Sequence, residues 1–164
     1  MAEDKVSTLA RKFKLEVAPG DVDPEEADWT VLRGIQELNP SKDDNLEDDS
    51  DYDSDGWTSQ VRTGQSWSLE VKVARKASGG DSVEYDEGQE IVRKASDQFG
   101  AEGTVHVRWY NRNGGDEAYQ GRAQAGFTDD GGSTTDLSTA TLTLTGTGKR
   151  ETIDNPAEAG TPGE

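Results

Sequence analysis

The sequence predicts a mainly β protein: an antiparallel β-sandwich or barrel-like domain with one flanking helix and a long acidic loop. Apolar and polar residues alternate in several short segments separated by glycine-rich turns, as half-buried antiparallel strands require. Only one segment, at about residues 86–99, has helical spacing. We expect one domain, with a flexible N-terminus at 1–8, a body at 9–148 and an extended tail at 149–164.

The first strands are predicted from their alternation. In the segment 9–18, apolar residues alternate with charged ones, and a Pro-Gly pair ends the strand. The segment Trp29–Leu38 has apolar residues on both faces, which indicates a strand covered on both sides. The segment 66–76 has the clearest alternation, with one apolar and one polar face.

One amphipathic helix is predicted next. Asp86 and Gln89 form a capping-box pattern at its start. Ile91 and Phe99 belong to its apolar stripe, and Gly100 supplies a left-handed stop. This pattern is typical of a short helix docked on a sheet.

Three more alternating segments, at 104–112, 118–128 and 139–145, complete the predicted sheet. A glycine-rich turn joins the first two as an antiparallel hairpin. The core residues expected from the strand and helix patterns are Trp67, Leu69, Val71, Val73, Ile91, Phe99, Val105, Val107 and Trp109.

The long acidic loop is expected at residues 39–57. It holds eight acidic residues and one lysine, which is too much charge for a core. A folded protein that keeps such a loop presents it to a partner, either a neighbouring copy or a cation. The residues predicted to make contacts between subunits or rings are Asp43, Asp44, Asp48, Asp49, Asp51, Tyr52, Asp53, Asp55 and Trp57. The cations predicted to complement them are Lys12, Lys14, Arg62, Arg75 and Arg108.

The same loop contains a pattern typical of calcium ligands. Asp51, Asp53 and Asp55, followed by Gly56, match the start of an EF-hand loop, in which these oxygens surround the ion. The twelfth position should be glutamate and is Arg62, and the flanking segments are not helical. We therefore predict no metal site and no cofactor, with these three aspartates as weak candidates.

No catalytic constellation is visible, so we predict that the protein is not an enzyme. His106 is the only histidine, and it falls on the polar face of a strand without a carboxylate partner in the sequence. The segment Gly146-x-Gly148-Lys149 lacks the spacing of a phosphate-binding loop.

Composition limits the partners. The net charge of −17 repels phosphate backbones, so tight binding to nucleic acid is not expected. The chain has no cysteine, which excludes disulfides and thiolate metal sites. No apolar run approaches the length that spans a membrane, and the polar start is not that of a signal peptide. We expect no membrane insertion.

Several motifs occur in an order that is informative as a set. They are Trp29–Leu38, the acidic segment Asp51–Trp57, the strand entry Thr63–Leu69, a helix after Tyr85, Tyr119-x-Gly121, Leu142–Gly148 and Asn155-Pro156. In this order they resemble the major tail tube proteins of long-tailed, siphovirus-type bacteriophages, particularly those of actinobacterial hosts. The resemblance covers about residues 9–156.

The resemblance implies a tail tube fold and a structural role in a virion. Six copies would close into a ring, and the rings would stack into a tube through which DNA passes, without adhering, into the host. It implies homo-oligomeric contacts through the loop at 39–57. It also implies tape measure, tail terminator and distal tail proteins as partners, assembly in the host cytoplasm and a final location in the phage tail.

Two alternatives remain open at this point. One is a calcium-dependent β-sandwich binding module. The other is a tail terminator or head–tail joining protein of similar architecture, which forms a single ring. Self-polymerisation distinguishes them, because only a tube protein extends into long hollow filaments.

Overall fold

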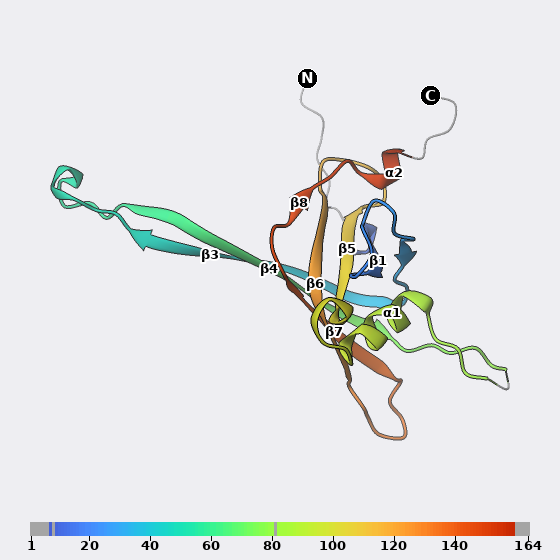
Figure 1. Cartoon of the computed structure of the whole chain (residues 1–164). Helices are drawn as coiled ribbons and strands as arrows, with labels where there is room; N and C mark the ends of the chain where they lie inside the picture. The colour runs from blue at the N-terminus through green and yellow to red at the C-terminus, as the bar shows by residue number, and fades with distance from the viewer. Residues whose placement is uncertain (1–6, 8, 81, 160–164) are drawn as a thin grey trace.

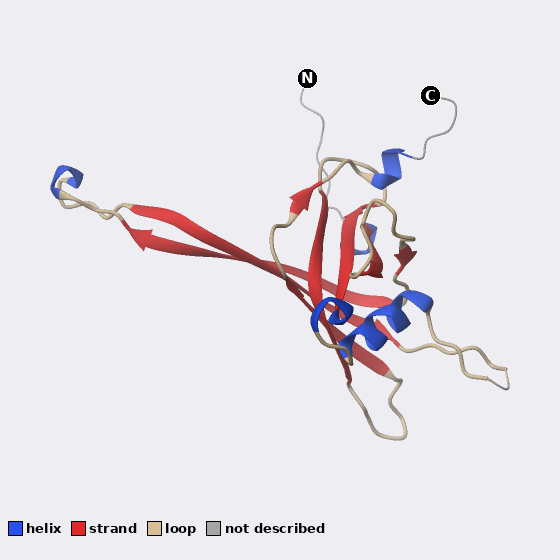
Figure 2. Ribbon diagram, in the orientation of Figure 1, coloured by secondary structure: helices blue, strands red, loops and turns tan. Residues whose placement is uncertain are grey.

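The computed structural model describes residues 7, 9–80 and 82–159, so the predicted flexible N-terminus lies almost wholly outside the described residues. In this part of the chain, eight strands form one antiparallel sheet (Figure 2). The mainly β class with one flanking helix is confirmed. The strands are β1 (Phe13–Pro19), β2 (Thr30–Val31), β3 (Ile35–Asp48), β4 (Gln60–Ala74), β5 (Thr104–Asn111), β6 (Ala118–Asp129), β7 (Thr139–Gly146) and β8 (Glu151–Thr152); the helices are α1 (Glu87–Ser96) and α2 (Pro156–Ala159).

The strand order places β1–β2 and β3 at opposite edges of the sheet. The order is β2-β1-β5-β6-β7-β4-β3, and β8 pairs with β6. Figure 1 shows β3 and β4 continuing together far beyond the other strands. The sheet therefore has a compact body and one long projection.

The segment predicted as a single strand from Trp29 to Leu38 is split in two. Its first part, β2, pairs with β1, whereas β3 pairs with β4 at the other end of the strand order. Gly34, with φ of 79°, lies at the break, and its carbonyl accepts a hydrogen bond from the Ala74 amide at 2.8 Å. Alternation in the sequence does not reveal this break, because it reports burial and not the pairing partner.

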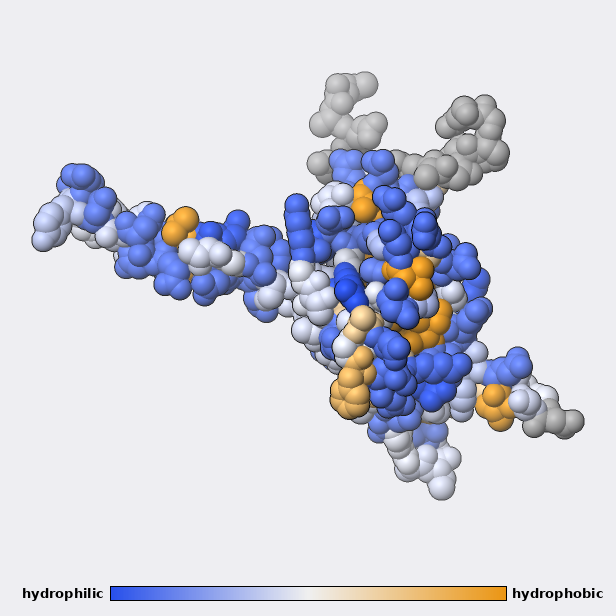
Figure 3. Space-filling view, in the orientation of Figure 1, coloured by the Kyte–Doolittle hydropathy of each residue, from blue (hydrophilic) through white to orange (hydrophobic). Residues whose placement is uncertain are grey.

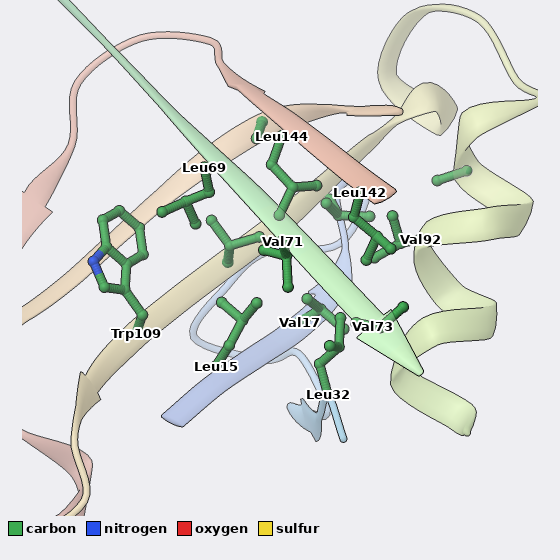
Figure 4. Packing of buried hydrophobic residues seen from close by; sticks show 14 of the residues in the cluster. Leu15, Val17, Leu32, Leu69, Val71, Val73, Val92, Trp109, Leu142 and Leu144 are labelled. Carbon is green, nitrogen blue, oxygen red and sulfur yellow. The ribbon is translucent and has the colours of Figure 1, made fainter. Parts of the chain in front are cut away.

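The core lies where the curved sheet crosses over itself beside α1. Figure 4 shows β4 crossing over β1, with Leu15, Val17 and Val71 between the two strands and Val92 of α1 to one side. The predicted core residues that are buried are Trp67, Leu69, Val71, Val73, Val105, Val107 and Trp109, and Ile91 packs against them partly buried.

Phe99 is not a core residue, and the prediction is wrong there. Its side chain is 93% exposed. Helix α1 ends at Ser96, and the Asp97 amide caps its last carbonyls. The apolar stripe therefore stops one turn early, which leaves Phe99 in extended backbone outside the helix.

Only one of the two hydrogen bonds of the predicted capping box is present at the start of α1. The Asp86 carboxylate accepts a hydrogen bond from the Gln89 amide at 3.2 Å. The Gln89 side chain turns inward and donates to the carbonyls of Arg33 at 2.7 Å and Ala74 at 3.1 Å. Gln89 thus joins α1 to the residue before the break and to the end of β4.

Trp67 packs where the body meets the projection. Its indole nitrogen donates to the Gly148 carbonyl at 3.0 Å, and its ring lies 5.6 Å from that of Trp109. The ring rests on Gly121 and Gly146, and a Cβ atom at either position would lie 2.4 Å from a ring carbon. These two glycines provide the space that the indole occupies.

We expect Gly121→Ala to lower the free energy of unfolding by about 1–3 kcal/mol, because the new methyl group overpacks Trp67. The matched control is Gly64→Ala, since a Cβ atom there would meet only the Asn45 Cβ at 3.7 Å. Chemical denaturation of both variants measures the difference. Equal stabilities would contradict the packing of Trp67 on Gly121.

Both faces of β5 are covered, although its sequence suggests one polar face. His106 is buried, and its Nε2 lies 2.7 Å from the Val22 carbonyl oxygen. The Tyr110 hydroxyl donates to the buried Glu16 carboxylate at 3.0 Å, and Arg108 contacts the same carboxylate. The polar residues of this face are therefore paired inside the subunit.

Burial raises the pKa of Tyr110 to about 12, and the adjacent Glu16 carboxylate adds to the effect. The neutral phenol therefore stabilises the fold fully below pH 10, its ordinary value, and this contribution is lost as the pH rises towards 12. We expect the wild-type protein to lose stability across this interval relative to Tyr110→Phe. Unfolding free energies of both proteins against pH provide the measurement, and parallel curves would refute the assignment.

The C-terminal segment docks on the body. β8 pairs with β6, and Asn155 is buried, with its side-chain amide donating to the Asn111 carbonyl at 2.9 Å. The tail predicted as extended from residue 149 therefore contains a short strand and a helical turn. Its last five residues, 160–164, lie outside the described residues.

Candidate functional site: the acidic hairpin arm

The predicted acidic loop is mostly a β-hairpin. β3 continues to Asp48 and β4 begins at Gln60, so only residues 49–59 form the connecting loop. We define the arm as residues 43–66, the part of the hairpin beyond the pairing of β4 with β7. The loop predicted at 39–57 is therefore wrong for its first half, because a ribbon exposed on both faces leaves no apolar alternation in the sequence.

The arm is highly acidic and almost entirely exposed. It carries eight carboxylates and one cation, Arg62. Within it, every residue is exposed except Ser54 and Gly64, which are half-buried. Figure 3 shows an arm that is hydrophilic over most of its visible surface.

Polar side chains join the two strands of the arm. The Asn45 amide donates to the Thr63 hydroxyl at 2.7 Å, and the Gln65 amide donates to Asp44 at 3.0 Å. Arg62 lies 3.2 Å from the second Asp44 oxygen. The hydrogen bond from Gln65, with Arg62 nearby, lowers the pKa of Asp44, so this carboxylate is ionised at neutral pH.

The tip of the arm is folded. Asp51 caps a 3₁₀ turn at Tyr52–Ser54, and its carboxylate accepts from the Asp53 amide at 3.0 Å and the Ser54 hydroxyl at 3.1 Å. The Trp57 amide donates to the Ser54 carbonyl at 2.9 Å. These bonds shape the tip within the isolated subunit.

The candidate calcium ligands do not converge on a common point. Among the residues that the structure describes, no group of three or more His, Cys, Asp or Glu side chains is placed to hold a metal ion. One Asp51 oxygen already accepts the two hydrogen bonds of the cap. The arm therefore offers charge at its surface and not a preformed cation cage.

Large apolar side chains accompany the charge. Tyr52 is fully exposed and Trp57 is 79% exposed at the tip, while Leu46 and Val61 are about half-exposed on the strands. An isolated two-stranded hairpin is only marginally stable in water. Tyrosine and tryptophan are also enriched at protein interfaces. The arm thus has the properties of a surface that another molecule covers.

Two of the predicted complementary cations are used inside the body. The Arg75 guanidinium lies 3.1 Å from the Glu90 carboxylate, and its side chain is only 6% exposed. Arg108 pairs with Glu16. The prediction is wrong for these two arginines, because each already neutralises a carboxylate of its own subunit.

The other three predicted cations remain near the surface. Arg62 pairs with Asp44 of its own arm. Lys12 and Lys14 make no ion pair among the described residues. Only these two lysines are therefore available as predicted to meet an acidic surface of another molecule.

Several solved structures share this fold. A chain from the tail of an empty gene transfer agent particle, determined with C6 symmetry, superposes with a TM-score of 0.65 at 13% identity, covering 90% of this chain and 99% of that one. A chain from the virion of the native gene transfer agent particle gives 0.66 at 12% identity with the same coverage. A chain from the 6-fold symmetrised baseplate of the anti-feeding prophage gives 0.53 at 10% identity, covering 94% and 98%.

No protein-family model matches the sequence, and no curated protein does. In the described residues, no helix has the length and hydrophobicity needed to cross a membrane. These structural neighbours are chains of the gene transfer agent particle and of the anti-feeding prophage baseplate. The chain therefore shares its fold with a chain of the gene transfer agent tail.

Proposed function

We propose that this protein is the subunit of a tail tube, in which six copies close into a ring and rings stack head to tail. The observation that carries the proposal is the arm: a folded, acidic hairpin that has exposed aromatic residues at its tip and contributes no residue to the core cluster of its own subunit. In the tube, the arm contacts a neighbouring subunit or ring. The fold shared with chains of 6-fold particles supports this arrangement.

The body also has features that favour assembly. No strand of the described residues pairs with the outer edge of β3, and unpaired edges readily accept another chain. Contacts between two different surfaces of identical subunits generate rings or open filaments. Arm and edge together provide such surfaces.

The charge suits a conduit for DNA. A tube of subunits that each carry −17 repels the phosphate backbone and prevents DNA from adhering during ejection into the host. We further propose a siphovirus-type virion tail as the location, with assembly in the host cytoplasm. Tape measure, tail terminator and distal tail proteins would be its neighbours there.

Electron microscopy of the concentrated protein in negative stain tests the proposal. We expect long hollow filaments, promoted by salt between about 0.1 M and 1 M, because the Debye length falls from about 10 Å to about 3 Å and the repulsion between subunits weakens. Single rings that never stack would indicate a terminator or joining protein instead. A protein that remains monomeric under all these conditions would contradict the tube.

A further inference from the structure

A groove of about 680 Å³ lies between the two edges of the sheet. One side is formed by β1 with Val31 of β2, and the other by the first residues of β3, Ile35 to Leu38. We call this groove the seam. Its apolar lining includes Phe13, Ile35 and Leu38, which are only partly buried by the subunit itself.

The seam is the site of an unusual concentration of positive charge. It is lined by one carboxylate, Glu37, and by five of the 17 basic residues of the chain. None of the five makes an ion pair among the described residues. The five cations are Arg11, Lys12, Lys14, Arg33 and Arg112.

The arm tip has the complementary composition. Residues 47–59 contain six carboxylates and no cation, together with the exposed rings of Tyr52 and Trp57. We propose that the seam of each subunit binds the arm tip of another copy, with the carboxylates against the five cations and the aromatic rings against the apolar lining. This inference rests on the proposed role of the arm in assembly.

The tip cannot reach the seam of its own subunit. The same strand, β3, begins in the seam and ends at the tip. The eleven residues from Leu38 to Asp48 are ten steps of the chain and span about 34 Å at the usual rise of a strand. Figure 1 shows the arm directed away from the body. The contact must therefore join two copies, each of which donates one tip and accepts another.

A second basic depression is a weaker candidate. It measures about 420 Å³ and has three cationic lining residues, Lys42, Lys149 and Arg150. Arg150 already stacks on the Tyr119 ring, 4.2 Å from its centre. This depression supplies the control for the experiment.

The proposed contact is compatible with assembly promoted by salt. Screening acts mainly on the long-range repulsion between exposed charges of like sign. Ion pairs that become partly buried in the seam are screened much less. Salt therefore removes the barrier to encounter while the docked tip is retained.

A charge exchange tests the pairing of tip and seam. The seam variant carries Lys12→Glu, Lys14→Glu and Arg33→Glu; the tip variant carries Glu47→Lys, Asp48→Lys, Asp49→Lys and Asp53→Lys, which makes the tip net positive. We expect each variant alone to stay folded and to need about a hundredfold higher concentration to assemble, because like charges meet in the contact. An equimolar mixture should assemble near the wild-type concentration, since each tip then finds a seam of opposite charge.

The control variant carries Lys42→Glu, Lys149→Glu and Arg150→Glu. Mixing it with the tip variant should not restore assembly. Rescue by this control, or no rescue by the seam variant, would overturn the inference.

Cross-linking separates this inference from the proposed function. Carbodiimide treatment of a mixture of ¹⁴N- and ¹⁵N-labelled wild-type protein should join Lys12 or Lys14 to tip carboxylates between differently labelled copies, as identified by mass spectrometry. Tubes without such links would overturn the seam contact and leave the tube intact. Linked oligomers without tubes would support the seam contact and contradict the tube, and the absence of both would contradict both.

Discussion

Val71→Asp is expected to unfold the subunit. Val71 is 0% exposed, and in the sheet it lies opposite Leu38 on one side and Leu142 on the other. An aspartate there would place an unpaired charge inside the core. The expected loss is about 4 kcal/mol or more, which is a large part of the roughly 5–15 kcal/mol that stabilises a typical domain.

The matched control is the same substitution on the same strand, Val61→Asp. Val61 lies in the arm and is 46% exposed, so its replacement should change the free energy of unfolding by no more than about 0.5 kcal/mol. Thermal and chemical denaturation of both monomers give the comparison. A normal melting curve for Val71→Asp would refute the assignment of this face of β4 to the core.

Replacing the arm by a two-residue turn is expected to separate folding from assembly. Lys42 and Trp67 are directly paired at the base of the arm, so an Asn-Gly turn in place of residues 43–66 can close the hairpin there. No residue of the core cluster lies within the arm. The variant should therefore be a folded, β-rich monomer that no longer forms tubes at any concentration at which the wild type does.

Circular dichroism, melting and negative-stain microscopy of the arm-replaced protein provide the measurements. Removal of only Asp43 to Asp55 is a less clean experiment, because it leaves the outer part of β4 without its partner strand. Loss of the fold in the arm-replaced protein would show that the arm belongs to the folding unit. Tubes that persist without the arm would end its proposed role in assembly.

The elements with one buried face could be predicted from the periodicity of the sequence alone. Leu142 and Leu144 of β7 and the alternating residues of β4 are buried where the period-two pattern places them. The start of α1 at Asp86 follows from its capping residue. Burial on one face imposes a pattern on the sequence, so these elements could be predicted without knowledge of their neighbours.

The arm and the seam could not be predicted from periodicity. Asn39 to Asp48 form a strand because they pair with β4, and an exposed ribbon buries neither face, so its sequence reads as a charged loop. Arg11, Lys12 and Lys14 are close in the sequence, which is a visible signal. Arg33 and Arg112 join them only because the two sheet edges meet at one groove.

Local periodicity and charge thus predicted a mainly β protein with one helix and an acidic segment outside the core. Only the tertiary structure showed which side chains pair with one another. Arg108 pairs with Glu16 of its own subunit across 92 residues of sequence, whereas the seam cations make no ion pair among the described residues. The reason is that periodicity reports the burial of each residue, while pairing depends on residues that are brought together only when the sheet closes around its core.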